Sequence, residues 1–377
     1  MSQQQPTQRV LSIDWLKGLI VPVMIYCHVL QFFGNIEAHA AIDPIIMVIN
    51  VLIFPTFLFL YGRTTQLAYL QKPFRAAWPR MLHQAWVLYA AFAISGIGYR
   101  LLAEKRPMRH TAISDVLMLQ DIPGWSEFLI SFALFALLML VGFGLWRAVS
   151  GKLWAALGLS AASLAFAALM PYDKVSSVPL ALVTGGTQFA YFPVLPYLMY
   201  PLMGLYIQRN GMQKKWIWLG TSALMTLTSA GHALTQGGWP SRFPPSPMWV
   251  MLTALPLCLL HLLSEWWSAF REQKLADIHS APLRRILSFP RDIIQFMGRH
   301  SLFFLVSSNL VLFTMRGMGL SPQFMNKLAF PWNQQIRSPL GALSWTAVLL
   351  AALTLLLLIT GLPIAPKERR TPKMDAH

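Results

Sequence analysis

Long apolar windows recur along the whole chain and are separated by short polar segments. Ten of these windows are about 18 to 25 residues long, which is enough for an α-helix to cross the hydrocarbon core of a bilayer. They lie at about 15–34, 44–62, 81–102, 126–146, 152–170, 189–207, 216–235, 247–269, 295–315 and 339–362. The pattern predicts an all-α protein, a polytopic transmembrane bundle of about ten helices.

The composition agrees with this pattern. Hydrophobic residues make up 55% of the chain and charged residues 12%, which is about half of the charged share of a soluble protein. The net charge of +16 is spread over short clusters between the windows, whereas a nucleic-acid-binding domain concentrates its basic residues on one face. We therefore expect a single integral membrane domain over residues 1–377, with polar tails at about 1–10 and 364–377, and no nucleic acid as a partner.

The positions of Lys and Arg predict the orientation, because cytoplasmic loops carry an excess of these residues. With the N-terminus inside, 21 of the 30 Lys and Arg residues fall on the cytoplasmic side and nine on the other. Both termini are then cytoplasmic, as an even number of spans requires.

The first window carries ionisable side chains at depths where they are costly and usually mark a functional site. Asp14, Lys17 and His28 share one helix face, with His28 about 16 Å along the axis from Lys17. Asp14 and Lys17 can form an ion pair that anchors the helix, or Lys17 can face an anionic ligand. The imidazole of His28 can act as a general base, or it can be a neutral histidine of the core.

The densest basic stretch lies between the second and third windows and contains Arg63, Lys72, Arg75 and Arg80. Guanidinium groups match phosphate oxygens in geometry, so this stretch can bind the phosphates of a nucleotide-bearing donor. The alternative is a basic cytoplasmic loop that contacts anionic lipid headgroups.

Two polar residues of the second half of the chain are further candidates. Arg242 precedes the tandem prolines Pro244 and Pro245, whose rigid backbone either holds it at a cavity mouth or forms a turn without a ligand. Asn309 lies inside the ninth window and needs a hydrogen-bond partner in the bundle. The prolines of segment 192–201 predict an irregular span, which either opens onto a cavity or is only kinked.

Sequence signatures of metal and nucleotide chemistry are missing. The chain has no glycine loop of the Walker or Rossmann type, no metal-type spacing of His or Cys, and no Gly-x-Ser-x-Gly turn. Cys27 and Cys258 lie in apolar windows, where a buried thiol behaves as a small hydrophobic group. We therefore expect no metal cofactor, and any transfer chemistry then depends on a base and on charge stabilisation.

The polar residues of the first window begin an ordered series of motifs. Arg9-Val-Leu-Ser-Ile-Asp14-Trp-Leu-Lys17-Gly18, with His28 eleven residues after Lys17, resembles the first-span signature of the membrane acyltransferase superfamily, which includes the acyltransferase-3 proteins. The closest likeness is to the bacterial branch related to heparan-alpha-glucosaminide N-acetyltransferase. Later matches are Phe57-Leu-Phe-Leu-Tyr-Gly62 with Arg75 and Arg80, Phe192-Pro-Val-Leu-Pro-Tyr197 with Gly204, Phe243-Pro-Pro-Ser246 and Gly298-Arg-His-Ser-Leu302.

This resemblance implies a multi-pass enzyme of a bacterial inner membrane. Such an enzyme takes an acyl group, often acetyl, from acyl-CoA on the cytosolic side and passes it to a sugar or other glycan acceptor at the far side. The resemblance implies that His28 is catalytic and that the donor is bound by Lys17, Arg75 and Arg80. From the residues themselves we add Asp14, Arg242 and Asn309 as candidates that orient the base or bind substrate.

Three positions depart from the family pattern. Lys17 replaces the usual arginine and gives up a bidentate phosphate contact. Tyr61 stands where a serine usually precedes the glycine, and Cys27 stands where an acidic residue often precedes the histidine. The carboxylate that orients His28 is therefore open, with Glu37, Asp43, Asp121 and Glu127 as the alternatives.

Two other classes of function fit the same pattern. A transporter or exporter of a glycan or small molecule can line its permeation route with the polar residues of the first window, and the proline-rich span at 192–201 suits such a route. A family member that has lost catalysis and keeps a scaffolding role is the other alternative.

Overall fold

The computed structural model describes residues 11–107, 110–189, 191–276, 280–318 and 337–362. These residues form helices and connecting segments, and the one pairing of β type among them is an isolated bridge between Gly186 and Phe189. The predicted all-α class is confirmed. The polar tails expected at about 1–10 and 364–377 lie outside the described residues.

The helices follow the predicted windows closely. In chain order they are α1 (Leu11–Phe33), α2 (Ile42–Thr65), α3 (Phe74–Gly98), α4 (His110–Leu117), α5 (Glu127–Val141), α6 (Phe143–Val149), α7 (Leu153–Leu169), α8 (Val178–Thr184), α9 (Met199–Asn210), α10 (Lys215–Gln236), α11 (Pro247–Leu252), α12 (Ala254–Ala276), α13 (Ala281–Arg299), α14 (Ser301–Gly317) and α16 (Pro339–Ile359). Single π-helical turns, Gln66–Leu70 and Tyr99–Ala103, extend α2 and α3.

Within the described residues, five segments are long and apolar enough to cross a membrane: α1, α2 with its extension, α3 with its extension, Pro247–Phe270 and α16. Two bent pairs bring the number to seven if each counts as one span, because α5 and α6 meet at 86° and Ser288–Arg299 meets α14 at 77°. The predicted window at 126–146 is therefore a broken helix rather than a straight one. The window at 189–207 is helical only from Met199, as its prolines suggested.

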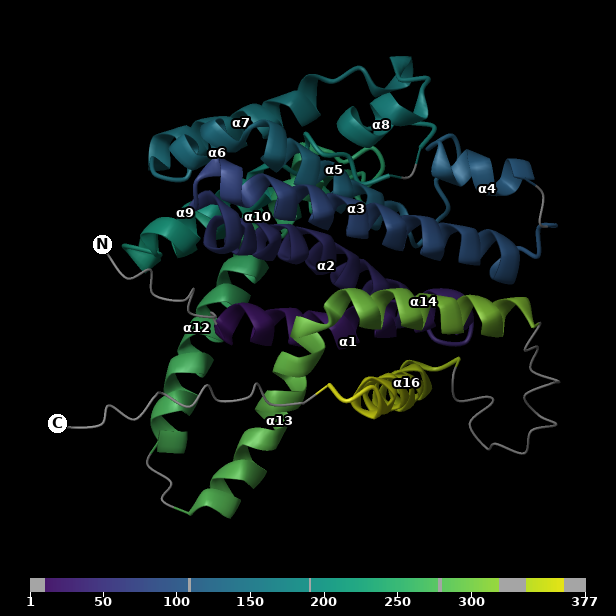
Figure 1. Cartoon of the computed structure of the whole chain (residues 1–377). Helices are drawn as coiled ribbons and strands as arrows, with labels where there is room; N and C mark the ends of the chain where they lie inside the picture. Colours follow the sequence, from purple (N-terminus) through teal and green to yellow (C-terminus); the bar gives the residue numbers. More distant parts are fainter. Residues whose placement is uncertain (1–10, 108–109, 190, 277–279, 319–336, 363–377) are drawn as a thin grey trace.

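The first three long helices lie side by side and set the direction of the bundle (Figure 1). Short connections make α2 antiparallel to α1 and to α3. Lys17 of α1 donates to Thr64 of α2 at one end, and the Cys27 thiol contacts Asn50 of α2 toward the other. One end of the bundle therefore holds the Lys17 layer, and the layer of His28 lies toward the opposite end.

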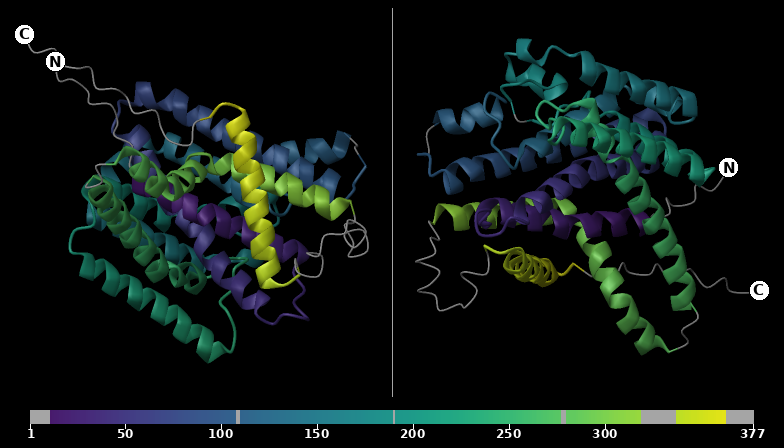
Figure 2. Two further views of the ribbon diagram at one scale, coloured as in Figure 1. Left: turned by 90° about the horizontal axis from the view of Figure 1, so that it is seen from below. Right: turned by 180° about the vertical axis from the view of Figure 1, so that it is seen from behind.

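The later helices wrap around this group. Helix α9 packs on α2, α5 packs on α3, and α13, α14 and α16 contact α1. Helices α12 and α13 form a hairpin that projects from the bundle, and α16 crosses α1 at a steep angle (Figures 1 and 2). The site described below is thus built on α1 and α2, with α5 held beside them by α3.

Glycines of the motifs lie where helices cross at close range. A Cβ at Gly18 of α1 would stand 1.8 Å from the carbonyl oxygen of Ile294 in α13, and one at Gly298 would stand 1.9 Å from that of Asp14. A Cβ at Gly62 of α2 would stand 2.2 Å from the carbonyl oxygen of Pro201 in α9. Small residues permit such close backbone approach in membrane bundles. The motif glycines therefore serve packing.

Replacing Gly62 with alanine is expected to destabilise the bundle by about 3 kcal/mol, the upper end of the usual cost of overpacking. The reason is that the added methyl group meets backbone rather than a movable side chain. The melting temperature in detergent measures the effect. Gly158→Ala in α7 is the matched control, since no atom lies within 4 Å of its Cβ. An equal loss of stability in both variants would contradict the crossing argument.

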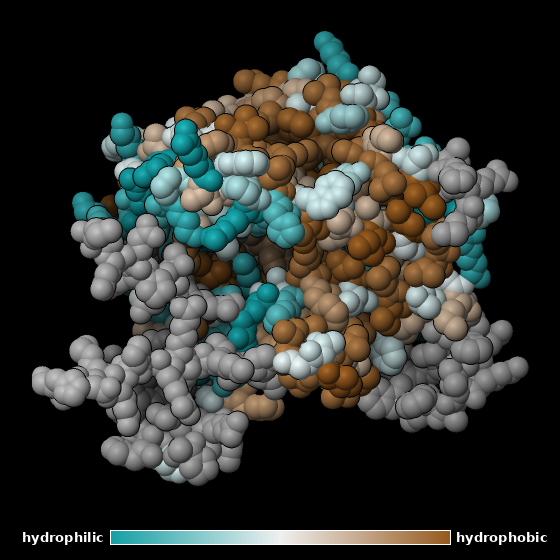
Figure 3. Space-filling view, in the orientation of Figure 1, coloured by the Kyte–Doolittle hydropathy of each residue, from teal (hydrophilic) through white to brown (hydrophobic). Residues whose placement is uncertain are grey.

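The surface agrees with a bilayer as the surroundings. Large apolar side chains are exposed on many helices, including Trp86 at 64%, Ile94 at 55% and Leu355 at 59%. Apolar residues cover most of the face in Figure 3, while hydrophilic residues gather toward its left side. Exposed apolar surface on this scale is not stable in water.

Candidate active site

A cavity of about 250 Å³ lies where α1, α2 and α5 meet the segments around Trp125, Phe192 and Arg242. Its polar lining consists of Cys27, His28, Gln31, Asn50, Glu127 and Arg242. Its aromatic lining consists of Phe54, Phe57, Trp125, Phe128, Phe192 and Phe243. The cavity therefore combines ionisable groups with ring faces in a small volume.

His28 is held by one hydrogen bond with a clear direction. Its Nδ1 lies 2.9 Å from Oδ1 of Asn309 in α14. The amide nitrogen of Asn309 donates to the carbonyl oxygen of Trp125 at 3.0 Å and to the hydroxyl of Ser95 at 3.4 Å. Because a carbonyl can only accept, the Asn309 amide is oriented with its oxygen toward the imidazole. Nδ1 of His28 therefore carries the proton, and Nε2 carries the lone pair.

This arrangement resolves which group orients His28. None of the four carboxylates considered from the sequence bonds to it, and the fully buried amide of Asn309 takes that place. Glu127 lines the same cavity. The prediction that Asn309 needs a partner in the bundle is confirmed, and its partners come from α1, α3 and the segment before α5.

Trp125 links the loop before α5 to the histidine. Its indole nitrogen donates to Gln31 at 3.0 Å, and its ring lies 4.4 Å from the ring of Phe32. The backbone φ of Trp125 is +60°, a conformation that is uncommon for a residue with a bulky side chain. The surrounding contacts hold this turn, which places the Trp125 carbonyl next to Asn309.

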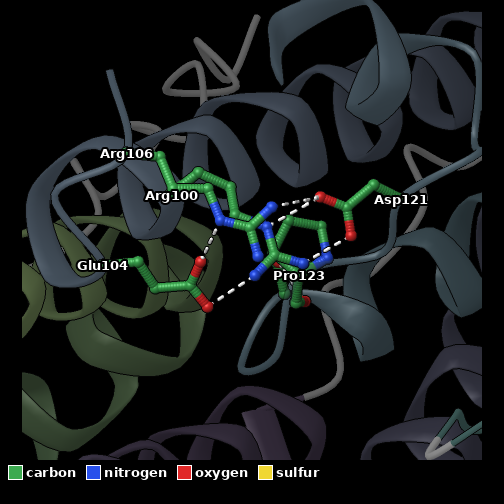
Figure 4. Close-up of polar contacts among 6 residues, drawn as sticks. Arg100, Glu104, Arg106, Asp121 and Pro123 are labelled. Carbon is green, nitrogen blue, oxygen red and sulfur yellow. Dashed lines mark hydrogen bonds and ion pairs between the residues drawn. The ribbon is translucent and has the colours of Figure 1, made fainter. Parts of the chain in front are cut away.

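An ion-pair cluster anchors the same loop at the bundle surface. Asp121 accepts from Nε of Arg100 at 2.7 Å and also from its Nη2. Arg100 bonds to Glu104 as well, and Glu104 in turn pairs with Arg106 at 2.6 Å (Figure 4). The bidentate pair of Arg100 and Asp121 is the geometrically strong one. It ties the end of α3 to the chain four residues before Trp125.

Glu127 and Arg242 bring opposite charges to the cavity. Oε2 of Glu127 and Nε of Arg242 are both buried and have no hydrogen-bond partner in the described part of the chain. The guanidinium of Arg242 lies over the rings of Phe192 and Phe243, at 5.1 and 4.6 Å from their centres. Burial lowers the pKa of Arg242, and the nearby Glu127 opposes that shift. Buried polar atoms left without partners are available to a ligand.

The basic residues assigned to the donor lie at the other end of the bundle. Lys17 is half-buried and donates to Thr64 at 3.2 Å. Arg75 and Arg80 are exposed in the first two turns of α3. Asp14 is buried where α1 crosses α13. None of these four residues lines the cavity of His28.

Arg63 is buried, although the sequence places it in the same basic stretch as the exposed Arg75 and Arg80. It is 4% exposed, and its guanidinium donates to Glu265 at 2.9 Å, to Nδ1 of His261 at 3.2 Å and to Gln208 at 2.9 Å. Ser12 also donates to Glu265, at 2.7 Å. One feature of the sequence could have indicated this network: Glu265 lies in an apolar window, with His261 four residues before it. A carboxylate at membrane depth requires a partner.

The cysteines and the other residue types that can bind metals were also located in the structure. Cys27 and Cys258 are both buried free thiols. Within the residues that the structure describes, no three His, Cys, Asp or Glu side chains gather closely enough to hold a metal ion.

Comparison with known families decides the class of the protein. The family model described as heparan-alpha-glucosaminide N-acetyltransferase, catalytic, matches residues 9–237, which is more than half of the chain. The chain belongs to this family. The resemblance inferred from the motifs is thereby confirmed. No curated protein and no solved structure matches the chain significantly.

Family membership and the apolar helices make the chain an integral membrane protein of the N-acetyltransferase type. The matched segment of the heparan-alpha-glucosaminide N-acetyltransferase family contains His28, Lys17, Arg75 and Arg80. Arg242 and Asn309 come after it. The cavity therefore combines residues of the family segment with residues that follow it.

Proposed function

We propose that the protein transfers an acyl group, in the first place acetyl, from acyl-CoA to a hydroxyl or amine of a sugar, with His28 as the general base. The observation that carries this proposal is the orientation of the imidazole. Asn309 accepts a hydrogen bond from Nδ1 of His28 and so keeps the proton on that nitrogen. Nε2 of His28 is then free to accept a proton, and His28 lines the cavity. A general base has to be within hydrogen-bond reach of the proton that it takes.

The proposed reaction balances with His28 alone as the proton carrier. Nε2 takes the proton from the acceptor as its oxygen or nitrogen attacks the thioester carbonyl. The tetrahedral intermediate collapses, the carbon–sulfur bond breaks, and the thiolate of CoA leaves. The imidazolium of His28 then gives its proton to that thiolate, so the enzyme returns to its starting state. Neutral imidazole suits the first step at physiological pH, and the imidazolium that it becomes suits the second.

The cavity supports a sugar as the acceptor. Aromatic rings and buried polar groups line it together, and binding sites combine such apolar walls with a few placed polar groups. The free carboxylate oxygen of Glu127 can accept from a hydroxyl or ammonium group, and Arg242 can donate to a ring or hydroxyl oxygen. Asn50 and Gln31 add amide groups to the same lining.

The opposite end of the bundle supports donor binding from the cytosol. Arg75 and Arg80 are exposed there, and Lys17 lies in the same layer. Exposed guanidinium groups can bind the phosphates of CoA. In this proposal the pantetheine arm carries the thioester from that layer along α1 to His28, over the separation of about 16 Å given by the helix rise.

The test is an acyl-transfer assay with the purified protein in lipid nanodiscs. Labelled acetyl-CoA is supplied with glucosamine or a glucosamine-terminated oligosaccharide, and free CoA and the acetylated sugar are measured. We expect CoA release that depends on the acceptor, with one acetylated product per CoA. Export is the second candidate, since a polar cavity next to an irregular span also suits transport. Uptake of the labelled sugar into proteoliposomes without acetyl-CoA, and no acetylated product, would favour it.

A further inference from the structure

A second and larger hollow, of about 480 Å³, lies between α7, α9, α10 and α12. Its walls are mainly aliphatic and aromatic side chains, among them Leu157, Met203, Ile217 and Met225. Leu157 and Ile217 are 38% and 39% exposed, so the hollow is a groove that opens at the surface of the bundle. It shares no lining residue with the cavity of His28. We call it the α7–α10 groove.

Helix α10 forms one wall of this groove and is weakly packed. Ser229 is its one buried residue, although the helix is 22 residues long. It contacts α11 and α12, and its Trp218 ring lies 6.0 Å from the ring of Tyr206 in α9, whereas the groove separates it from α7. Leu224 and Leu227 are 68% and 66% exposed on its surface. A helix of this kind needs another apolar surface to complete its packing.

The groove has a basic end. Lys214 lines it, and Lys215 begins α10 directly beside it. The first turn of α10 contains no acidic residue. Glu265, one turn after His261 of the groove wall, is already paired with Arg63 at 2.9 Å. The two lysines therefore leave positive charge at this end, and Trp216 and Trp218 stand next to it, as residues at a membrane interface do.

We propose that the α7–α10 groove binds an anionic phospholipid, with an acyl chain in the groove and the phosphate at Lys214 and Lys215. The apolar wall along α10 runs from Lys214 to Met225, which is about 16 Å of helix and matches one leaflet of a hydrocarbon core about 30 Å thick. Basic pockets between helices on the cytoplasmic side bind anionic headgroups. The topology places these lysines on that side.

This proposal is independent of the acyltransferase reaction. The lipid fills the gap between α7 and α10 and supplies the packing that α10 lacks, so its effect is on stability and on retention of the lipid. A free anion would neutralise the charge of the lysines but would not pack against the apolar wall. A zwitterionic lipid would fill the wall but not balance the lysines.

The test measures lipid retention by native mass spectrometry and melting temperature in detergent, with the full chain. Phosphatidylglycerol is expected to be retained and to raise the melting temperature. The retained fraction of phosphatidylcholine is expected to be at least threefold lower, with a smaller rise in the melting temperature. Inorganic phosphate and glycerol phosphate are expected to change neither. If either soluble anion has the same effect as the lipid, the site is an anion site and the proposal is wrong.

Two pairs of variants separate the groove from general surface charge. The double variant Lys214→Gln with Lys215→Gln should lose the preference for phosphatidylglycerol, whereas Lys72→Gln with Arg147→Gln should keep it. Ala161→Phe fills the groove and should lose retention, whereas Ala162→Phe is exposed on the same helix outside the groove and should keep it. Equal loss within either pair overturns the proposal.

Discussion

The variant His28→Ala is expected to lose acyl transfer by about 10²- to 10⁴-fold, the usual contribution of a general base. The loss should appear in kcat, because the imidazole acts on the reacting proton rather than on the bound donor. His28 lies at the end of a hydrogen-bonded group, and its removal leaves Oδ1 of Asn309 facing the enlarged cavity. Purified protein and labelled acetyl-CoA in nanodiscs provide the measurement.

The control for this loss is a second histidine variant. His232 is exposed on α10 and does not line the cavity, so His232→Ala should transfer at the normal rate. Donor binding to His28→Ala, measured as stabilisation by CoA, should be unchanged, since the basic layer is intact. Normal transfer by a folded His28→Ala would rule out the assignment of the base.

Asn309→Leu is expected to reduce kcat by on the order of 10²-fold, because the wrong histidine tautomer places the proton on the nitrogen that must accept one. Leucine has a similar volume and no polar atoms, so Nδ1 of His28 loses its acceptor. The Trp125 carbonyl also loses its donor, which costs stability by about 1–3 kcal/mol. Activity and melting temperature must therefore be measured on the same preparation.

Asn309→Asp separates orientation from packing. A carboxylate still accepts from Nδ1 of His28 but cannot donate to the Trp125 carbonyl. We expect Asn309→Asp to be as unstable as Asn309→Leu and to retain much more of the activity. If the two variants lose activity in proportion to their loss of stability, Asn309 has only a structural role.

The sequence predicts the helices well because apolar length is a local property. The windows coincide with most of the long helices of the described chain, including the irregular start at 192–198 that the prolines indicated, whereas the short helices α4 and α8 lie in no predicted window. The bends between α5 and α6 and between α13 and α14 were not predicted. Each depends on packing against helices distant in sequence, which hydropathy does not report.

The site is only partly predictable for the same reason. His28 stands out because a titratable group in an apolar window is costly, and Arg242 stands out because tandem prolines follow it; both line the cavity. The sequence offers four carboxylates as partners of His28, whereas its partner in the structure is Asn309, 281 residues away. No local pattern pairs the two. Arg63 was grouped with the exposed arginines on charge alone, while its burial follows from Glu265 on a distant helix.

The family match ends at residue 237, yet the imidazole depends on an amide at position 309. A protein shortened after the matched segment would keep the histidine and lose the group that fixes its tautomer. Relatives that share only the first two thirds of the chain can thus differ in competence while their matched residues are the same. Judging whether such a relative is active requires inspecting what its last helices supply to the base.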